Sequence, residues 1–199
     1  MLIKTIEVGI NRANCYIVGC QETKEAVIID PGAEAGKIKK ALLKSGLTAK
    51  FIINTHGHAD HIGANKDFDL PIFIHSQDAD FLIDPYKNMS ASFGFNITSP
   101  KPQRLLKDND KIDMGRIVLK IIHTPGHTPG GISIIAESNV FTGDTLFAGG
   151  VGRTDFAKSS ESDLFDSIKN KLFVLGDDFV VYPGHGPSTT IGREKSNIL

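Results

Sequence analysis

Three histidines and an aspartate fall within six consecutive positions, at His56, His58, Asp60 and His61. The apolar run 51–54 precedes them, so we expect a buried strand that delivers His56 and His58 in extended chain with both side chains on one side. Asp60 and His61 stand where the chain turns into a helix, which directs them toward a neighbouring position. Imidazole and carboxylate are the usual ligands of zinc, iron and manganese at hydrolytic centres, so this spacing predicts a metal site rather than an incidental polar loop.

Three further stretches place a possible ligand after a predicted strand. His127 lies in a turn with two prolines and two glycines, and Asp144 and His185 each follow an apolar run, at 140–142 and 179–182. Glycine precedes all three residues and proline is near two of them, which restricts the backbone as preorganisation of a metal site requires. We therefore predict that distant parts of the chain complete the site begun by the histidine-rich stretch.

Bulk composition is that of an ordinary soluble protein. The chain has 199 residues, a net charge of -1 and a pI near 6.6, so it has no strong positive field for nucleic acid or an anionic membrane. The N-terminus lacks the apolar core of a signal peptide, and no segment approaches the ~18 apolar residues of a membrane span. We expect a cytoplasmic protein that acts on a small molecule.

The two cysteines, Cys15 and Cys20, lie in an apolar stretch that resembles a strand. Residues at odd spacing on a strand point to opposite faces, so a disulfide between these two is not expected. We predict two buried thiols in a reducing compartment.

The pattern of apolar residues predicts an α+β fold. The expected strands are 3–8, 14–18, 26–29, 51–54, 71–75, 116–122, 132–135, 140–142 and 179–182, and the expected helices are 35–45, 76–83 and 160–175. Gly46 ends the first helix, and Ser160 with Asp163 resembles a capping box. Strands followed by a helix occur twice with no linker between them, which predicts a single domain over residues 1–199 with two sheets face to face and helices outside.

The motif H-x-H-x-D-H, followed by a distant histidine, an aspartate and a final histidine, resembles the metallo-β-lactamase fold superfamily. The stretch Gly-Asp-Thr-Leu-Phe at 143–147 is similar to the glyoxalase II branch of that superfamily, and the resemblance covers nearly the whole chain. It implies an αβ/βα four-layer sandwich with the site at one edge of the paired sheets. It further implies that His56, His58 and His127 hold a first metal, that Asp60, His61 and His185 hold a second, and that Asp144 bridges them.

The chemistry of such a centre is hydrolysis. Two dications ~3.5–4 Å apart lower the pKa of a shared water enough to give a bridging hydroxide at neutral pH, and zinc is the expected metal, with iron or manganese as alternatives. A thiolate leaves with little acid assistance because a thiol pKa is near ~8.5, so we expect a small thioester as the substrate. Asp60 is expected to orient the hydroxide as a catalytic residue.

The chain departs from glyoxalase II in two places. That enzyme has a helical C-terminal extension, whereas only 14 residues follow His185 here, so we predict a short relative that lacks it. The branch also has a lysine and an aromatic residue after its glycine-rich turn to bind glutathione. Here Arg153 is the expected substrate-binding cation and Asp155 stands near the aromatic position, so this departure also allows a small thioester of a thiol other than glutathione.

Two other functions stay open as alternatives. The run Gly-Arg-Thr-Asp-Phe at 152–156 also resembles persulfide dioxygenases, which implies a single Fe(II) held by His56, His127 and Asp144. The second alternative is hydrolysis of a lactone, or metal binding without turnover.

Several residues have both a structural and a functional interpretation. Asp30 fits either a turn or a hydrogen bond to a metal-bound histidine, and Arg153 with Asp155 fits either a salt bridge or a substrate contact. We expect His75 to be structural or exposed, and His123 to have a packing or supporting role rather than to bind metal.

Two segments near the predicted site lack a clear period. The stretch 86–102 contains aromatic residues among serine, asparagine and glycine, which is typical of a lid or binding rim but also fits plain packing. The charged residues 193–195 predict a polar helix near the end of the chain.

Overall fold

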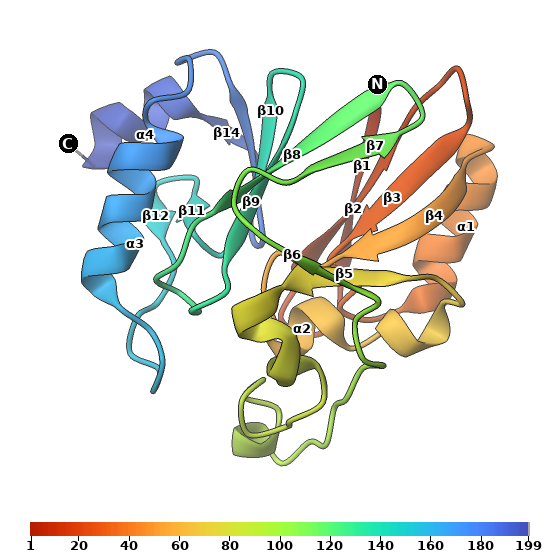
Figure 1. Cartoon of the computed structure of the whole chain (residues 1–199), viewed down its shortest axis with the longest axis horizontal. Helices are drawn as coiled ribbons and strands as arrows, with labels where there is room; N and C mark the ends of the chain where they lie inside the picture. The colour runs from red at the N-terminus through yellow and green to blue at the C-terminus, as the bar shows by residue number, and fades with distance from the viewer. Residues whose placement is uncertain (199) are drawn as a thin grey trace.

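The computed structural model describes residues 1–198 and contains two six-stranded sheets that pack face to face (Figure 1). The first sheet has the order β1-β2-β3-β4-β5-β6 and the second β14-β13-β10-β9-β8-β7, and a small hairpin, β11-β12, stands apart. Figure 1 shows α1 against the outer face of the first sheet and α3 and α4 against the outer face of the second. This arrangement confirms the predicted αβ/βα sandwich.

The first sheet begins as an antiparallel meander and continues as a parallel sheet. The meander strands are β1 (Leu2–Val8), β2 (Ala13–Gly19) and β3 (Glu25–Ile29). The parallel strands that follow are β4 (Thr48–Ile53), β5 (Ile72–His75) and β6 (Arg104–Leu106). Because β4 runs parallel to β3, the segments after these two strands emerge at the same edge of the sheet.

The second sheet is antiparallel except for one pair. Its strands are β7 (Lys111–Met114), β8 (Ile117–His123), β9 (Ile132–Ala136), β10 (Asn139–Gly143), β13 (Val180–Pro183) and β14 (Thr189–Thr190). The separate hairpin consists of β11 (Leu146–Phe147) and β12 (Gly150–Val151). Strands β10 and β13 are parallel, so the residues that follow them also lie at one edge.

The helices agree with the predicted positions but not everywhere with the predicted type. They are α1 (Ala35–Ser45), α2 (Ala59–Ile62), α3 (Glu161–Ser167) and α4 (Ile191–Ile198), with 3-10 turns at Asn65–Asp67, Ser76–Leu82 and Ala91–Phe93. The predicted helix 76–83 is therefore a 3-10 helix. None of the helices within residues 1–198 has both the length and the apolar character needed to cross a bilayer.

The predicted helix 160–175 was too long. Ser160 caps α3 as expected, because its hydroxyl accepts a hydrogen bond from the Asp163 amide at 3.2 Å. The backbone then widens into a π-helical turn at Ile168–Leu172, where the Phe173 amide bonds to the Ile168 carbonyl. A wider turn cannot continue an α-helix without interruption, so the element ends before residue 175.

Strand β2 is buried on both faces because it lies between two hydrophobic clusters. Cys15 packs in the cluster between the first sheet and α1, whereas Tyr16 and Cys20 pack in the cluster between the two sheets. Both cysteines are buried and free, as predicted, and their places in different clusters confirm that they point to opposite faces. A third cluster, around Leu164, joins α3 to the second sheet.

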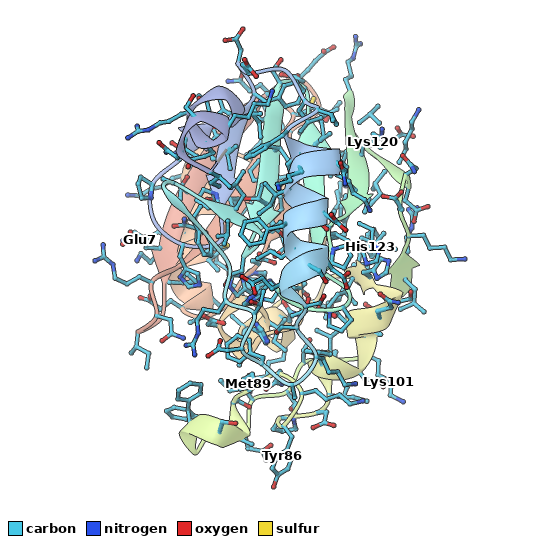
Figure 2. The ribbon with its side chains drawn as sticks, turned by 90° about the vertical axis from the view of Figure 1, so that its left-hand side faces the viewer. Glu7, Tyr86, Met89, Lys101, Lys120 and His123 are labelled. Atoms are coloured by element: carbon cyan, nitrogen blue, oxygen red, sulfur yellow. The ribbon has the colours of Figure 1, made fainter. Side chains whose placement is uncertain are left out.

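The irregular stretch 86–102 projects from one end of the molecule. Figure 2 shows Tyr86 there, pointing away from the sheets, and its side chain is 82% exposed. Phe93 is 71% exposed on the same stretch. Asn88 is fully buried and its side-chain amide donates to the carbonyls of Phe81 and Ile97, so an internal anchor supports the exposed aromatic residues.

Candidate metal centre

The structure brings all the predicted metal-binding residues to one edge of the paired sheets. His56 and His58 follow β4, Asp60 and His61 lie in α2, His127 lies between β8 and β9, Asp144 follows β10, and His185 follows β13. The parallel pairs explain the convergence, because the segments after β4, β10 and β13 leave their sheets toward a common edge. Gly184 permits the close approach, since a side chain there would overlap Asp144 Oδ1.

A first donor group consists of His56, His58 and His127. One ring nitrogen of each lies within 4.8 Å of the others, and all three side chains are buried. Nδ1 of His58 lies 2.9 Å from Nε2 of His127. Three imidazoles that face a common point in this way form a typical transition-metal site.

A second donor group consists of Asp60, His61 and His185, whose ligand atoms also lie within 4.8 Å of one another. Asp144 stands between the two groups. Its carboxylate oxygens lie 3.5 Å from Nε2 of His61, 3.6 Å from Nε2 of His185 and 3.6 Å from Nε2 of His127. One carboxylate therefore faces histidines of both groups.

Hydrogen bonds on the outer side of the rings orient the histidines. Nδ1 of His127 donates to the Arg153 carbonyl at 2.8 Å, and Nδ1 of His61 bonds to Asp30 Oδ2 at 3.0 Å. In each ring the second nitrogen, Nε2, then faces the centre, and a metal ion that binds there would take the place of any proton on it. Such outer contacts fix the tautomer that a metal requires.

Asp30 supports the centre from behind. A further possible group joins Asp30 to His56 and His61, but both oxygens of Asp30 are already used. Oδ1 accepts the Thr55 amide at 2.7 Å, and Oδ2 accepts the Thr55 hydroxyl at 2.6 Å in addition to His61. Asp30 also has a φ of 52°, so both sequence interpretations, a turn and a histidine contact, hold together.

Burial keeps the first donor group neutral. Desolvation lowers the pKa of His56 well below its usual value and that of His58 to about 3, and the neighbouring imidazoles lower both further. Burial also lowers the pKa of His127. Neutral imidazole is the form that binds a metal, so these rings are ready for a cation at neutral pH.

The second donor group has the opposite character. Burial by itself disfavours the charged form of His61, but the carboxylates of Asp144, Asp60 and Asp30 together raise its pKa to about 10. Burial likewise opposes ionisation of Asp60, yet His61, His185 and Asn11 lower its pKa below the usual range. This half of the centre concentrates negative charge that attracts a cation.

Unpaired buried atoms show that these residues fit a metal centre. Within residues 1–198, three buried side-chain atoms have no hydrogen-bond partner: His56 Nε2, His61 Nε2 and Asp144 Oδ1. An unpaired buried polar atom costs about 1–3 kcal/mol, and all three atoms belong to the predicted ligands. Divalent metal ions would satisfy them, and this nitrogen and oxygen donor set accepts zinc, iron or manganese.

The turn between β1 and β2 supports the second donor group, which the sequence did not indicate. The Asn11 side chain donates to Asp60 Oδ2 at 3.1 Å, and its carbonyl accepts Nδ1 of His185 at 3.2 Å. Asn14 then ties the same hairpin to the loop of His185, because its amide N–H donates to the Gly184 carbonyl at 2.7 Å. Residues 11–14 and 184–185, which are far apart in the sequence, thus meet beside the second donor group.

Arg153 contacts the centre through its backbone, and its side chain faces outward. The guanidinium forms a two-bond ion pair with Asp155, at 2.9 and 2.7 Å, and lies over the Phe156 ring at 5.0 Å. The Phe156 ring meets His58 and His127 edge-on at 5.3 and 5.7 Å. This aromatic wall was missed, although it ends the Gly-Arg-Thr-Asp-Phe run.

His75 and His123 lie outside both donor groups. Their rings stack at 4.0 Å, His75 is buried, and Nε2 of His123 donates to the Pro129 carbonyl at 2.8 Å. This geometry agrees with the expected packing roles.

An open cleft of about 630 Å³ lies beside the second donor group. His185 stands at one side of it, and the tyrosines Tyr16 and Tyr182 form part of its wall. Arg12 and Glu7 form an exposed ion pair along the same cleft. The cleft gives a small molecule a route to His185.

Comparison with known proteins establishes the class. The family model of the metallo-beta-lactamase superfamily matches residues 8–185. An uncharacterised protein of Mycobacterium tuberculosis is 41% identical over 98% of this chain and 95% of its own. A Haemophilus influenzae protein named hydroxyacylglutathione hydrolase GloC is 38% identical over 98% and 95%. The chain therefore belongs to the metallo-beta-lactamase superfamily, a group of metallo-hydrolases.

Solved structures agree with this assignment. BLEG-1, a B3 metallo-beta-lactamase, has a TM-score of 0.94 and 36% identity, with coverage of 99% of this chain and 98% of its own. TTHA1623 in a di-iron-bound form has a TM-score of 0.87 and 33% identity, with 98% coverage of both chains. ETHE1 from Myxococcus xanthus has a TM-score of 0.81 and 29% identity, with coverage of 99% and 83%.

Proposed function

We propose that this protein is a binuclear metal-dependent hydrolase of small thioesters. The observation that carries the proposal is the position of Asp144, which faces His127 of the first donor group and both His61 and His185 of the second. A carboxylate shared in this way favours two metal ions over one. When bound, two such ions supply an activated water at neutral pH and polarise a substrate carbonyl.

The residues of the chain then have distinct tasks. His56, His58 and His127 would hold one ion, and Asp60, His61 and His185 the other. The pKa of Asp60 is lowered, so its carboxylate is ionised, and its side chain is 28% exposed. As the catalytic residue, it would accept a hydrogen bond from the attacking water and so orient it. The Phe156 ring covers one side of His58 and His127, which it meets edge-on.

A thioester suits this centre for a chemical reason. Water oxygen forms a bond to the acyl carbon, the carbon–sulfur bond breaks, and the sulfur leaves with the electron pair as a thiolate, while the water protons pass to solvent. Because a thiol has a pKa near ~8.5, the leaving group does not need a strong general acid. The relative named hydroxyacylglutathione hydrolase supports a hydroxyacyl thioester as the substrate class.

A persulfide dioxygenase is the second candidate. It is favoured by the structural similarity to ETHE1 and by the motif at 152–156, and it would use His56, His127 and Asp144 around a single iron. The two candidates differ in metal content and in the co-substrate consumed.

The first test is metal content by elemental analysis, together with thiol release from a set of hydroxyacyl thioesters. We expect close to two metals per chain and thiol release. A single iron with oxygen uptake on a persulfide, and no thiol release, would replace the proposal by the dioxygenase. Lactone cleavage without thiol release would indicate the lactone hydrolase.

Arg153 is proposed as a substrate contact, and its ion pair with Asp155 allows a matched test. Asp155→Ala frees the guanidinium, whereas Arg153→Ala removes it. If Arg153 binds an anionic thiol, Arg153→Ala raises KM by about tenfold with little change in kcat, and Asp155→Ala leaves KM unchanged or lowers it. An equal rise in KM for both variants would show that only the salt bridge matters.

A further inference from the structure

A buried aspartate outside the predicted ligands joins the two loops that carry the first donor group. Asp78 lies in the 3-10 helix Ser76–Leu82 and its side chain is inaccessible to solvent. Oδ2 accepts the Gly57 amide at 3.0 Å and the Thr128 hydroxyl at 2.7 Å, and Oδ1 accepts the Gly130 amide at 2.7 Å. All three donors lie one to three positions from a histidine of the first group.

The positions of these donors relate Asp78 to the metal centre. Gly57 separates His56 from His58, and Thr128 directly follows His127. The carboxylate therefore holds the β4 loop and the β8–β9 loop against each other. It links two segments whose histidines, His58 and His127, are 69 positions apart and must converge at this point.

Two glycines make this contact possible. A side chain at Gly57 would overlap Phe81 of the same 3-10 helix, at 2.3 Å from its Cβ. A side chain at Gly130 would overlap the Asp78 carboxylate, at 2.6 Å from Oδ1. Both loops thus lack a side chain where they approach this helix, so the backbone of each loop packs directly against it.

The energetics favour a positioning role over simple core packing. Burial of a carboxylate is unfavourable, and here it raises the pKa of Asp78 to about 6 although three hydrogen bonds oppose that rise. An apolar residue would fill the same space at lower cost. What an apolar residue cannot do is accept bonds from both loops at once.

We propose that Asp78 is a positioning residue that preorganises His56, His58 and His127 for the first metal ion. The proposal rests on the metal centre of the proposed function and not on its substrate. Asp78 contacts no ligand atom and acts through the backbones of the two loops, so its effect falls on the first donor group and not on the second.

Zinc affinity, measured by competition with a chromophoric chelator, tests this with each donor group in isolation. His185→Ala disables the second group and leaves the first, and His58→Ala does the reverse. In the His185→Ala protein we expect Asp78→Asn to weaken zinc binding by about tenfold or more, as loss of outer contacts does at other metal sites. In the His58→Ala protein we expect no change.

Asp80→Asn is the matched control. Asp80 lies on the same 3-10 helix, its side chain is 71% exposed, and it pairs with Lys87 at the surface. It should leave zinc affinity unchanged in both backgrounds. Equal affinities of the Asp78→Asn and Asp80→Asn proteins would overturn the proposal, and so would an equal loss in both backgrounds.

A milder pair of variants decides the matter if Asp78→Asn does not fold. Thr128→Val removes one of the three bonds and keeps the shape, so zinc affinity of the first group should fall about fivefold. Thr128→Ser keeps the hydroxyl and should restore the affinity. Loss of affinity in both variants, or in neither, would contradict the positioning role.

Failure of this inference is separable from failure of the proposed function. A protein without thiol release can still show selective loss of zinc in Asp78→Asn, which would sustain the inference alone. A thioesterase whose Asp78→Asn variant binds zinc normally would sustain the function alone. Where both hold, added zinc should restore kcat of the Asp78→Asn enzyme with KM unchanged.

Discussion

The two donor groups of the metal centre differ in charge, in exposure and in how the fold supports them. The first consists of three buried histidines whose pKa values are lowered, chiefly by burial. The second combines two histidines whose pKa values are raised, His61 and His185, with an ionised aspartate, Asp60, and the side chains of Asp60 and His185 are both 28% exposed.

This contrast indicates two different ways to prepare a site for a cation. The first group is a neutral set, held by loops that converge on the buried side of the 3-10 helix Ser76–Leu82. The second group is electrostatic, because Asp144, Asp60 and Asp30 create a negative region that raises the pKa of His61 and that favours a metal cation in place of the proton. The second group also borders the open cleft, so we expect its metal to exchange more readily.

The largest effect is expected where the two groups meet. Asp144→Ala removes the carboxylate that faces both, so both metals should bind more weakly and kcat/KM should fall about a thousandfold or more. Elemental analysis and thiol release measure this. Asp113→Ala, an exposed position on β7, is the control and should behave like the wild type. Retention of one tightly bound metal in Asp144→Ala would show that the groups are independent.

Removing one histidine from each group should separate the two halves. We expect His58→Ala to leave one metal in the carboxylate-rich group, and His185→Ala to leave one in the histidine-only group. Activity should fall by about a hundredfold in both, since each half supplies part of the stabilisation of the transition state. Metal content by mass spectrometry under native conditions distinguishes one ion from two. Loss of both ions from either variant would contradict two separable groups.

Metal removal should destabilise the fold, because it leaves buried ligand atoms unpaired. A ligand at about 100 times its Kd contributes about 2.7 kcal/mol, which corresponds to a Tm shift of roughly 5–10 °C for a chain of this size. Differential scanning calorimetry with and without a chelator measures the shift. In His58→Ala and His185→Ala the chelator should cause a smaller decrease. An unchanged Tm in the wild type would argue against bound metal.

The smallest effect concerns the support of the second group. Asn11→Ala removes the hydrogen bond to Asp60 but keeps the carbonyl that accepts from His185. Because the contact is exposed, we expect zinc affinity to fall only about threefold to tenfold, which corresponds to the net free energy of roughly one hydrogen bond. Asn170→Ala, on the outer π-helical turn, is the control. An effect confined to the first group would overturn the assignment of Asn11.

Much of this site follows from local sequence. His56, His58, Asp60 and His61 are close neighbours, so their spacing alone indicates a metal site. Apolar runs also predict most strands of the two sheets, because a strand buried on both faces, such as β2, leaves a continuous apolar signal. Strands such as β11, with two residues, carry no such signal and were not predicted.

The supporting residues could not be predicted in this way. Asn11 lies 49 positions from Asp60, and Asp78 lies 50 from Thr128. Such contacts depend on how the sheets dock, and neither residue type is distinctive in its local context. The π-helical turn was not predicted for a related reason. Ile168 and Leu172 are four positions apart, which is the spacing of an ordinary α-helix.

The contact between Asn14 and Gly184 has a consequence for the order of folding. These residues are about 170 positions apart, so the β1–β2 hairpin is synthesised well before the loop that it contacts. Contacts between such distant residues form slowly, because the chain between them must first become ordered. We therefore expect the second donor group, which needs His185, to be completed later in folding than the first.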